Sequence, residues 1–185
     1  MRALAARVGT GAMTIYNYVD GRGGLDELVT SAVFATVPLP PEPGADWRDD
    51  VRAVTTGLWR AVRAHPNAIP LVLTRRTLDE ATLDHAEALL RALRRGGRGG
   101  FALLTAFRAV SGFVTGFAQA ELAGPLAAGR GEDTGTVLAR AKALPAERYP
   151  GLREIADAAT QADPAAEFRA ALDIVIAGLG PASDR

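Results

Sequence analysis

Apolar residues recur at spacings of three and four along most of the chain, while alternation with a period of two is scarce. This spacing, together with abundant alanine and leucine, predicts amphipathic α-helices and an all-α fold. The predicted helices cover residues 2–8, 12–18, 24–36, 47–64, 67–76, 79–95, 100–123, 137–144, 150–161 and 164–179.

Proline and glycine divide these helices into two groups. Residues 37–47 read VPLPPEPGADW, and the prolines there break any helix because proline cannot donate to the helical ladder. We predict a small N-terminal domain over residues 1–36, a proline-rich connection over 37–46 and a larger helical domain over 47–185. A glycine-rich segment, residues 124–136, is predicted to be a mobile loop.

Apolar stripes along the predicted helices identify candidate core residues. In the small domain the expected buried residues are Leu4, Ala5, Val8 and Ile15 in the first two helices and Leu25, Leu28 and Val29 in the third. Asp46 is the expected N-cap of helix 47–64, whose inward stripe comprises Val51, Val54, Leu58 and Val62. Helix 100–123 carries bulky residues on one side and small residues on the other, and we expect both sides to be buried.

Composition excludes several classes of function. The chain has no cysteine, which rules out disulfides and thiolate metal sites and favours a reducing cytoplasm. It has two histidines without metal-ligand spacing, no GxSxG motif and no phosphate loop after a strand, so we predict no enzyme, cofactor or metal. No apolar run approaches the roughly 18 to 20 residues of a membrane helix, and no membrane partner is expected.

Local charge changes this picture at one place. The formal net charge is zero, but residues 1–24 hold three arginines against one aspartate, a net of +2. This small excess favours a front end that faces an anion.

The first two predicted helices have the spacing of a helix-turn-helix, in which the second helix enters the DNA major groove. That helix begins with Gly11 and Ala12, whose small size would let the backbone approach the bases. The hydroxyls of Thr10 and Thr14 would donate to phosphates, and a tyrosine would pack on sugar or a thymine methyl group. Short helical pairs are common, so the spacing alone leaves an ordinary packing role open.

Residues 1–29 read MRALAARVGTGAMTIYNYVDGRGGLDELV, a segment that resembles the DNA-binding region of the tetracycline-repressor (TetR) family. The resemblance lies in the small-Leu-Ala helix, the glycine turn, the Thr-Ile-Tyr core of the second helix and the leucine-rich helix that follows. More loosely, helix 47–64 followed by HPNAIPLVLTRR resembles the C-terminal domain of tetracycline-repressor-type members. The resemblance implies a homodimer that binds duplex DNA and a small-molecule effector.

The resemblance also assigns DNA contacts to individual residues. Arg2 falls where some members read a guanine, Tyr16 falls where the family contacts phosphate and sugar, and Arg22 replaces the basic residue that contacts phosphate. Packing for Tyr16 and plain solvation for the two arginines are the alternatives. The expected DNA-binding residues are Arg2, Thr10, Gly11, Ala12, Met13, Thr14, Tyr16, Tyr18 and Arg22.

By the same resemblance the larger domain should bind a small molecule among helices 47–64, 67–76, 79–95 and 100–123. Candidate lining residues combine aromatic walls with a few polar groups. They are Trp59, His65, Asn67, Thr74, Arg75, Phe107, Ser111, Val114 and Phe117. A core or surface role stays open for each, and Ser111 is expected to bond back to a carbonyl of its own helix.

Dimerisation has a physical basis as well, because a two-fold DNA site favours a two-fold protein. The expected interface joins the apolar stripe of the last helix to the small-residue side of helix 100–123. Its residues are Thr105, Ala109, Gly112, Gly116, Phe168, Leu172, Val175 and Leu179. The alternative is that these residues form ordinary core within one chain.

In the TetR family another helix precedes the helix pair, whereas this sequence opens at Met1, already inside the first helix of the pair. We therefore expect about 25 to 40 further residues upstream, the size of one helix plus an arm. The sequence as a whole predicts a cytoplasmic, ligand-responsive regulator, a repressor released from its operator by a small molecule. The alternative is a helical dimeric sensor or interaction protein without competent DNA binding.

Overall fold

The computed structural model describes residues 1–40, 42–74, 79–123 and 133–180. Within these ranges every regular element is a helix, which confirms the predicted all-α fold. The helices are α1 (Arg2–Val8), α2 (Ala12–Tyr16), α3 (Gly21–Ala35), α4 (Trp47–Ala64), the 3-10 helix η1 (Pro66–Ala68), α5 (Ile69–Thr74), α6 (Glu80–Arg95), α7 (Gly100–Ala123), α8 (Thr134–Lys142), α9 (Pro150–Ala159) and α10 (Pro164–Gly178).

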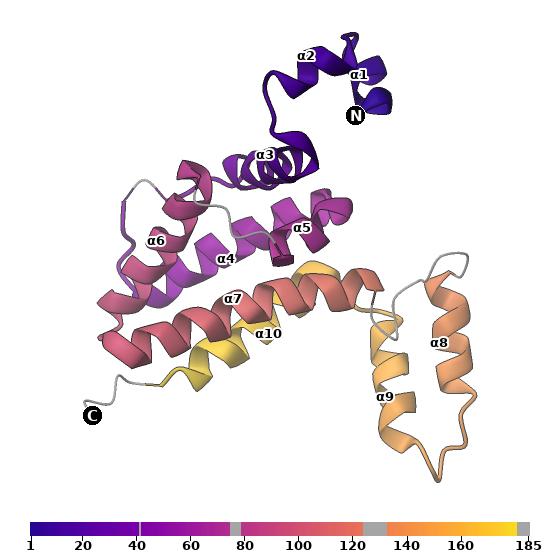
Figure 1. Cartoon of the computed structure of the whole chain (residues 1–185). Helices are drawn as coiled ribbons and strands as arrows, with labels where there is room; N and C mark the ends of the chain where they lie inside the picture. The colour runs from indigo at the N-terminus through magenta and orange to yellow at the C-terminus, as the bar shows by residue number, and fades with distance from the viewer. Residues whose placement is uncertain (41, 75–78, 124–132, 181–185) are drawn as a thin grey trace.

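Four long helices, α4, α6, α7 and α10, form the body of the molecule (Figure 1). They enclose one apolar core, which buries Val51, Val54 and Val62 of the stripe predicted on α4 and has Leu58 packed against its edge. Burying one such side chain contributes about 1.5–3 kcal/mol, so this core is the main source of stability. The other core residues are Trp59, Leu89, Ala92, Leu93, Leu103, Ala106, Val110, Val114, Ala118, Phe168, Leu172 and Ile176.

Aspartate side chains set the points at which the body helices begin. Asp46 accepts the backbone N–H of Arg48 at 2.9 Å, so the predicted N-cap of α4 is confirmed. That backbone hydrogen bond is the main reason why the pKa of Asp46 lies below its ordinary value. Asp79 caps α6 and Asp163 caps α10 in the same way.

A small head, made of α1 and α2, projects from the body at the end of α3 (Figure 1). The two helices are joined by a tight turn in which Gly9 has a φ of 74°, a left-handed conformation that favours glycine. Ala5 is buried in the pair, and Leu4 and Ile15 are half-buried. Val8 is 66% exposed, because α1 buries only its Ala5 side, so the core role predicted for Val8 was wrong.

Helix α3 connects the head to the body and packs against α4, α5 and α6. Leu28 and Val29 are exposed and Leu25 is only half-buried, so the sequence predicted the wrong face of this helix. The error arises because the face of α3 that packs on the body is displaced by one residue, about 100° around the helix, from the stripe predicted to be buried. The residues that α3 buries are Asp26, Thr30, Val33 and Phe34.

Helix α7 lies at the centre of the body. Over Gly100–Glu121 it is long and apolar enough to cross a membrane by length and composition, which corrects the prediction that no run approaches this length. One face packs against α4, α6 and α10, and its buried residues belong to the central core. The small-residue face is exposed in the single chain, and Leu104 on the bulky side is 42% exposed, so the expectation of burial on both sides was wrong.

Helices α8 and α9 form a hairpin that stands beside the body in Figure 1 and pack against each other. Val137 and Leu138 of α8 and Ala156 of α9 are buried between them. The loop predicted over 124–136 falls mostly on residues 124–132, which lie outside the described ranges. Its last residues, 134–136, form the first turn of α8.

The last helix, α10, turns its apolar stripe into the body of its own chain. Phe168 and Leu172 have 0% and 1% of their surface exposed and belong to the central core. They cannot also form a surface that meets a second copy, so their assignment to the dimer interface was wrong. Val175 and Leu179 are half-buried against the same core.

Candidate nucleic-acid interface and ligand site

The second helix of the head, α2, presents its side chains to solvent. Gly11 precedes it in an extended conformation, and the carbonyl of Gly11 accepts the N–H of Thr14 at 3.1 Å, which starts the helix. The side chains of Met13 and Tyr18 are 76% and 82% exposed, and Tyr16 is 49% exposed. A short helix with exposed polar and aromatic residues at the tip of a projecting head has the shape that a major groove admits.

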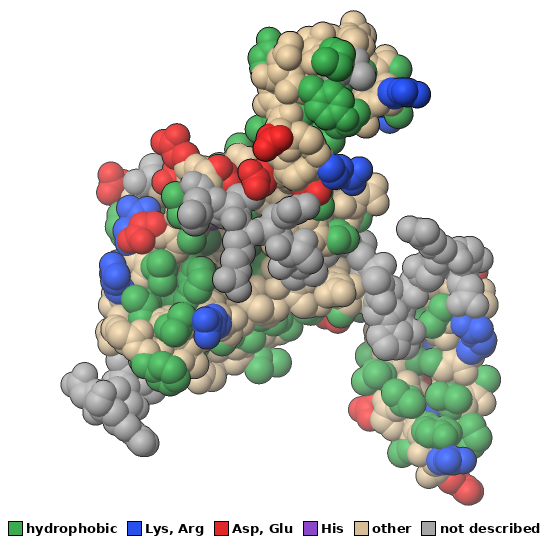
Figure 2. Space-filling model, in the orientation of Figure 1, with side chains coloured by type: hydrophobic (Ala, Val, Ile, Leu, Met, Phe, Trp, Pro, Cys, Tyr) green, Lys and Arg blue, Asp and Glu red, His purple; other side chains and the backbone are tan. Residues whose placement is uncertain are grey.

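The other residues predicted to bind DNA surround this helix. Figure 2 shows apolar side chains on the outer surface of the head, and Val8, Met13, Tyr16 and Tyr18 are its exposed large apolar residues. Thr10 is half-buried, and the side chain of Ala12 lies outside the described part of the structure. The exposed members of the set are Arg2, Gly11, Met13, Thr14, Tyr16, Tyr18 and Arg22.

Arg22 is held at the start of α3 by an ion pair within that helix. Its Nε lies 2.9 Å from Oδ1 of Asp26, whose carboxylate is 8% exposed, while the Arg22 side chain is 81% exposed. The sequence analysis missed Asp26, although the spacing of four residues between opposite charges is a recognisable helical signal. A buried carboxylate therefore orients an exposed guanidinium on the side of α3 nearest the head.

An aromatic cluster occupies the body where the ligand pocket was predicted. Trp59 stacks on Phe168 with ring centroids 4.6 Å apart, and Phe117 meets Phe168 edge-on at 5.4 Å. Phe113, which the sequence analysis did not select, lies 5.5 Å from Phe168. These rings and Val114 belong to the packed core or lie against it. The structure therefore places three predicted ligand residues, Trp59, Val114 and Phe117, together in the core.

Glu121 closes the edge of this cluster and was also missed. Its Oε2 accepts the indole N–H of Trp59 at 3.1 Å, and its Oε1 lies 2.7 Å from Nε of Arg63. The Arg63 guanidinium also lies over the Trp59 ring, 5.4 Å from its centroid. The polar atom of a buried tryptophan thus has its partner, as such groups normally do.

A hollow of about 500 Å³ lies beneath α3, between this helix, the end of α4 and η1. His65 and Asn67 line it, as predicted residues of the ligand site, but Trp59 and Phe117 do not. Its volume is within the range of small-molecule sites, and its walls are mainly apolar. The remaining lining residues are Val29, Ala32, Val33, Thr36, Ala64, Pro66 and Ala68.

The other predicted ligand residues are not gathered at this hollow. Phe107 is half-buried against the core, and the hydroxyl of Ser111 donates to the Phe107 carbonyl at 2.7 Å, which confirms the expected back-bond. Arg75 lies outside the described residues, and nothing is described of the side chain of Thr74.

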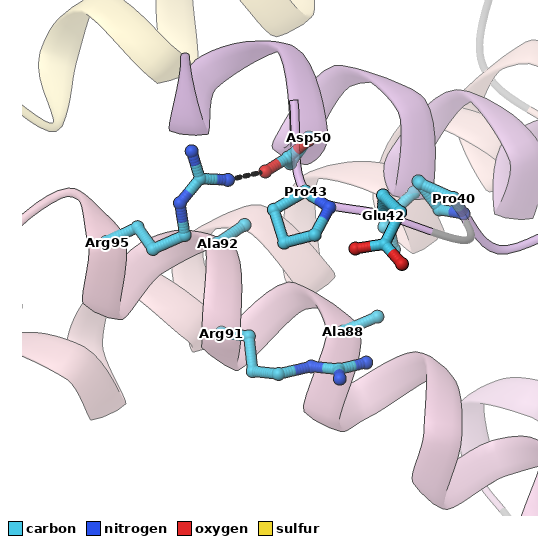
Figure 3. A pocket seen from close by; sticks show the side chains of 9 residues that line it. Pro40, Glu42, Pro43, Asp50, Ala88, Arg91, Ala92 and Arg95 are labelled. Atoms are coloured by element: carbon cyan, nitrogen blue, oxygen red, sulfur yellow. Dashed lines mark hydrogen bonds and ion pairs between the residues drawn. The ribbon is translucent and has the colours of Figure 1, made fainter. Parts of the chain in front are cut away.

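The proline-rich connection is clamped to the body by an ion pair. Arg95 of α6 pairs with Asp50 of α4 (Figure 3). Arg95 also donates to the carbonyl of Gly44 at 2.6 Å, and Asp50 accepts the Gly44 N–H at 2.8 Å. The hollow between the connection and α6 measures about 90 Å³, which is too small for a typical ligand. This site therefore fixes the path of the chain from α3 to α4.

Comparison with protein families decides the relationship. Residues 39–182 match the family described as "Tetracyclin repressor-like, C-terminal domain". The chain belongs to the tetracycline-repressor (TetR) family. This confirms the resemblance seen in the sequence, and the family is one of transcriptional regulators.

Two curated proteins are similar to this TetR-family chain. An HTH-type transcriptional regulator of Saccharopolyspora erythraea is 37% identical over 121 residues, 65% of this chain and 51% of that protein. The HTH-type transcriptional repressor DrrR1 of Streptomyces coeruleorubidus is 31% identical over 123 residues, 66% of this chain and 46% of that protein. The chain spans about half the length of the curated relatives it matches.

Solved structures of TetR-family proteins share the fold along nearly the whole chain. ActR of Streptomyces coelicolor in complex with actinorhodin has a TM-score of 0.76 and 28% identity, covering 97% of this chain and 85% of that one. The regulator SCO7222 of Streptomyces coelicolor has a TM-score of 0.75 and 31% identity, and the match covers 96% of this chain and 86% of that one.

Proposed function

We propose that this TetR-family chain is a ligand-responsive transcriptional repressor that binds duplex operator DNA through α2. The exposed face of α2 carries the proposal, because it is presented at the tip of a head that α3 joins to the body. The net charge of +2 over residues 1–24 supports contact with phosphates. The function we infer is binding rather than catalysis, in a soluble protein of the cytoplasm.

The relatives support both halves of this proposal. DrrR1 is named a transcriptional repressor, and ActR was solved in complex with actinorhodin, a small molecule. We infer the same two activities, operator binding and effector binding, for this chain.

The effector site that we propose is the hollow of about 500 Å³ beneath α3. Val29 and Val33 of α3 form one wall, and His65 and Asn67 form the polar part of the other. Because α3 leads directly into the head, a molecule that fits one position of α3 better than another would shift the head. The effector must bind the two positions with different affinity, or it shifts nothing.

The protein is proposed to act as a homodimer, with the exposed small-residue face of α7 at its centre. Thr105, Ala109, Gly112 and Gly116 are all exposed in the single chain, and a Cβ built on either glycine meets no other atom within 4 Å. Small residues let two backbones approach closely, and a two-fold dimer would place two heads on successive half-sites.

Operator binding is tested with a labelled duplex from the region upstream of the chain's own gene, by fluorescence anisotropy at several salt concentrations. Tyr16→Ala should weaken binding, and Arg22→Ala should lower the salt slope by about one unit, the value for one phosphate contact. Thermal melting of each variant shows whether folding is intact, which matters for Arg22 because its partner Asp26 is buried.

Arg7→Ala is the matched control, because it removes an exposed arginine of α1 that is not assigned to DNA. It should leave the salt slope nearer to that of the unchanged protein than Arg22→Ala does. Unchanged affinity in Tyr16→Ala and Arg22→Ala would remove α2 from the interface. Failure of the unchanged dimer to bind any duplex would favour the alternative, a dimeric sensor without DNA binding.

A further inference from the structure

The ion pair at the start of α3 joins a buried residue to an exposed one. Asp26 is 6% exposed, whereas the side chain of Arg22 is 81% exposed. An ion pair between two exposed side chains contributes little, because both long side chains lose conformational freedom when it forms. Asp26 lies on the face of α3 that is buried, so the freedom that this pair removes is mainly that of Arg22.

A carboxylate is a costly side chain at a buried position of a helix. Burying an ionised group loses hydration free energy, and apolar residues of similar volume often stabilise a fold as well as a buried ion pair does. The buried residues Val33 and Phe34, farther along α3, are apolar. The stability of the fold alone is therefore weak grounds for a carboxylate at Asp26.

The geometry of the pair leaves the outer part of the guanidinium open. Nε of Arg22 donates to Oδ1 of Asp26 at 2.9 Å. In the part of the chain that the structure describes, neither Nη group of Arg22 makes a hydrogen bond. A guanidinium has five N–H donors in a rigid plane, so a carboxylate on Nε leaves the four N–H bonds of the two Nη groups for another anion.

We propose that Asp26 is a positioning residue for operator binding, which holds Nε of Arg22 so that both Nη groups face a backbone phosphate. The proposal rests on the repressor function proposed above. Immobilising a long side chain on binding weakens affinity about two- to tenfold, and a guanidinium that is already ordered avoids this loss. In the complex one guanidinium bridges the buried carboxylate and the phosphate.

The charge of Asp26 acts in the direction opposite to its positioning role. A carboxylate close to DNA repels the phosphates, so loss of its charge alone should strengthen binding. Two variants separate the effects, because both remove the charge. Asp26→Asn keeps a side-chain oxygen that accepts from Nε, whereas Asp26→Leu has a similar size and no acceptor.

Operator binding of these variants is measured by fluorescence anisotropy with the duplex used for Tyr16→Ala. We expect Asp26→Leu to bind at least about threefold more weakly than Asp26→Asn, within the range for one ordered side chain. In the Arg22→Ala background the two variants should bind alike, because no guanidinium remains to be positioned. Thermal melting shows whether each variant folds.

Glu27→Gln is the matched control for charge. It removes the exposed carboxylate next to Asp26 in sequence, and it should bind the duplex at least as tightly as the unchanged protein. A loss of affinity in Glu27→Gln as large as that in Asp26→Leu would overturn the proposal, because positioning would then not depend on the carboxylate that holds Arg22.

Nitrogen NMR of the arginine Nε–H groups follows the pair directly and decides if Asp26→Leu does not fold. Arg22→Lys identifies the Arg22 signal. We expect this Nε–H to exchange slowly with water in the free protein and to keep its hydrogen-bonded position when the duplex is added. A signal that leaves this position on DNA binding would show that carboxylate and phosphate compete for Arg22.

Three further results would overturn the positioning role: equal binding by Asp26→Asn and Asp26→Leu, a difference between them that persists without Arg22, or loss of the Nε hydrogen bond in the complex. In each case the unchanged chain still binds DNA, so the repressor function stands. An unchanged chain that binds no duplex would remove both proposals.

Discussion

A single buried arginine joins three parts of the body at the scale of individual residues. The guanidinium of Arg98 donates to the carbonyl oxygens of Leu179 at 3.0 Å and Gly180 at 2.7 Å, at the end of α10. Its carbon lies 4.5 Å from the centroid of the Trp47 ring at the start of α4. Burial, and then the nearby charge of Arg48, lower the pKa of Arg98, but an arginine stays protonated and satisfies the unpaired carbonyls of a helix end.

Gly96 leaves room for this arginine, which gives a prediction. A Cβ built on Gly96 would lie 2.5 Å from Nη1 of Arg98 and 2.8 Å from the ring of Trp47. The guanidinium cannot move away without losing its carbonyl partners, so Gly96→Ala should lower the free energy of unfolding by about 1–3 kcal/mol. Gly99→Ala, where a Cβ meets nothing within 4 Å, should change it by less than about 0.5 kcal/mol. Urea unfolding of both variants checks this, and equal midpoints would contradict it.

Gly96 was readable in the sequence only as the end of a helix, and neither its contact with Arg98 nor the role of Arg98 could be predicted, for a physical reason. Their partners lie at α4 and α10, far away along the chain, so no local spacing marks them. Asp46, in contrast, was predicted because a cap bonds to residues two or three positions away. Signals that depend on neighbours in sequence were readable, and those that depend on tertiary packing were not.

The same distinction holds at the scale of elements. The bounds of α7 were predicted from glycine and apolar spacing, and α4 from its cap and its terminal proline. The faces of α3 and α10 were not predicted, because Leu28 and Leu172 are equally apolar and only the arrangement of neighbouring helices decides which is buried. The candidate ligand set was divided for this reason too, with Trp59 in the core and His65 at the hollow.

The cap of α4 gives a prediction about pH. The backbone N–H of Arg48 lowers the pKa of Asp46 in the folded chain below its ordinary value of 3.8. The ionised cap therefore adds stability above the unfolded pKa, and this contribution is lost as the pH falls through the folded pKa. Asp46→Asn keeps a capping acceptor and removes the titration.

We expect Asp46→Asn to be less stable than the unchanged protein at pH 7 and to approach it in acid below pH 3.8. Urea unfolding across this range measures the difference at each pH. Asp163→Asn, which makes the same substitution at the N-cap of α10, is the control. It shows how much of the pH-dependent loss of stability arises at any exposed aspartate cap. A difference that stays constant with pH would show that the charge of Asp46 has no part in the cap.

At the scale of the whole molecule, the structure shows that a substitution at Leu172 cannot serve as a test of dimerisation. A charge at Leu172 would split a dimer if this residue lay at the interface, but it is 1% exposed inside one chain. Leu172→Ala should instead cost about 2–5 kcal/mol of folding stability, the range for large-to-small changes in a core. Thermal melting would reveal this as a lower midpoint at every protein concentration.

The glycines of α7 allow dimerisation to be tested without disturbing the core. Leucine at Gly112 and Gly116 meets nothing near its Cβ in the single chain and favours helix, so the fold of the chain should be retained. Across a close two-fold contact the same side chains would overlap with the partner. We expect the double variant Gly112→Leu and Gly116→Leu to weaken dimerisation at least about tenfold, which corresponds to about 1.4 kcal/mol. Sedimentation equilibrium measures the dimer dissociation constant, and circular dichroism shows that helix content is kept.

Gly151→Leu on α9 is the control, because it adds the same side chain in open space outside the proposed interface. A double variant as dimeric as this control would place the two-fold contact on another face of the body.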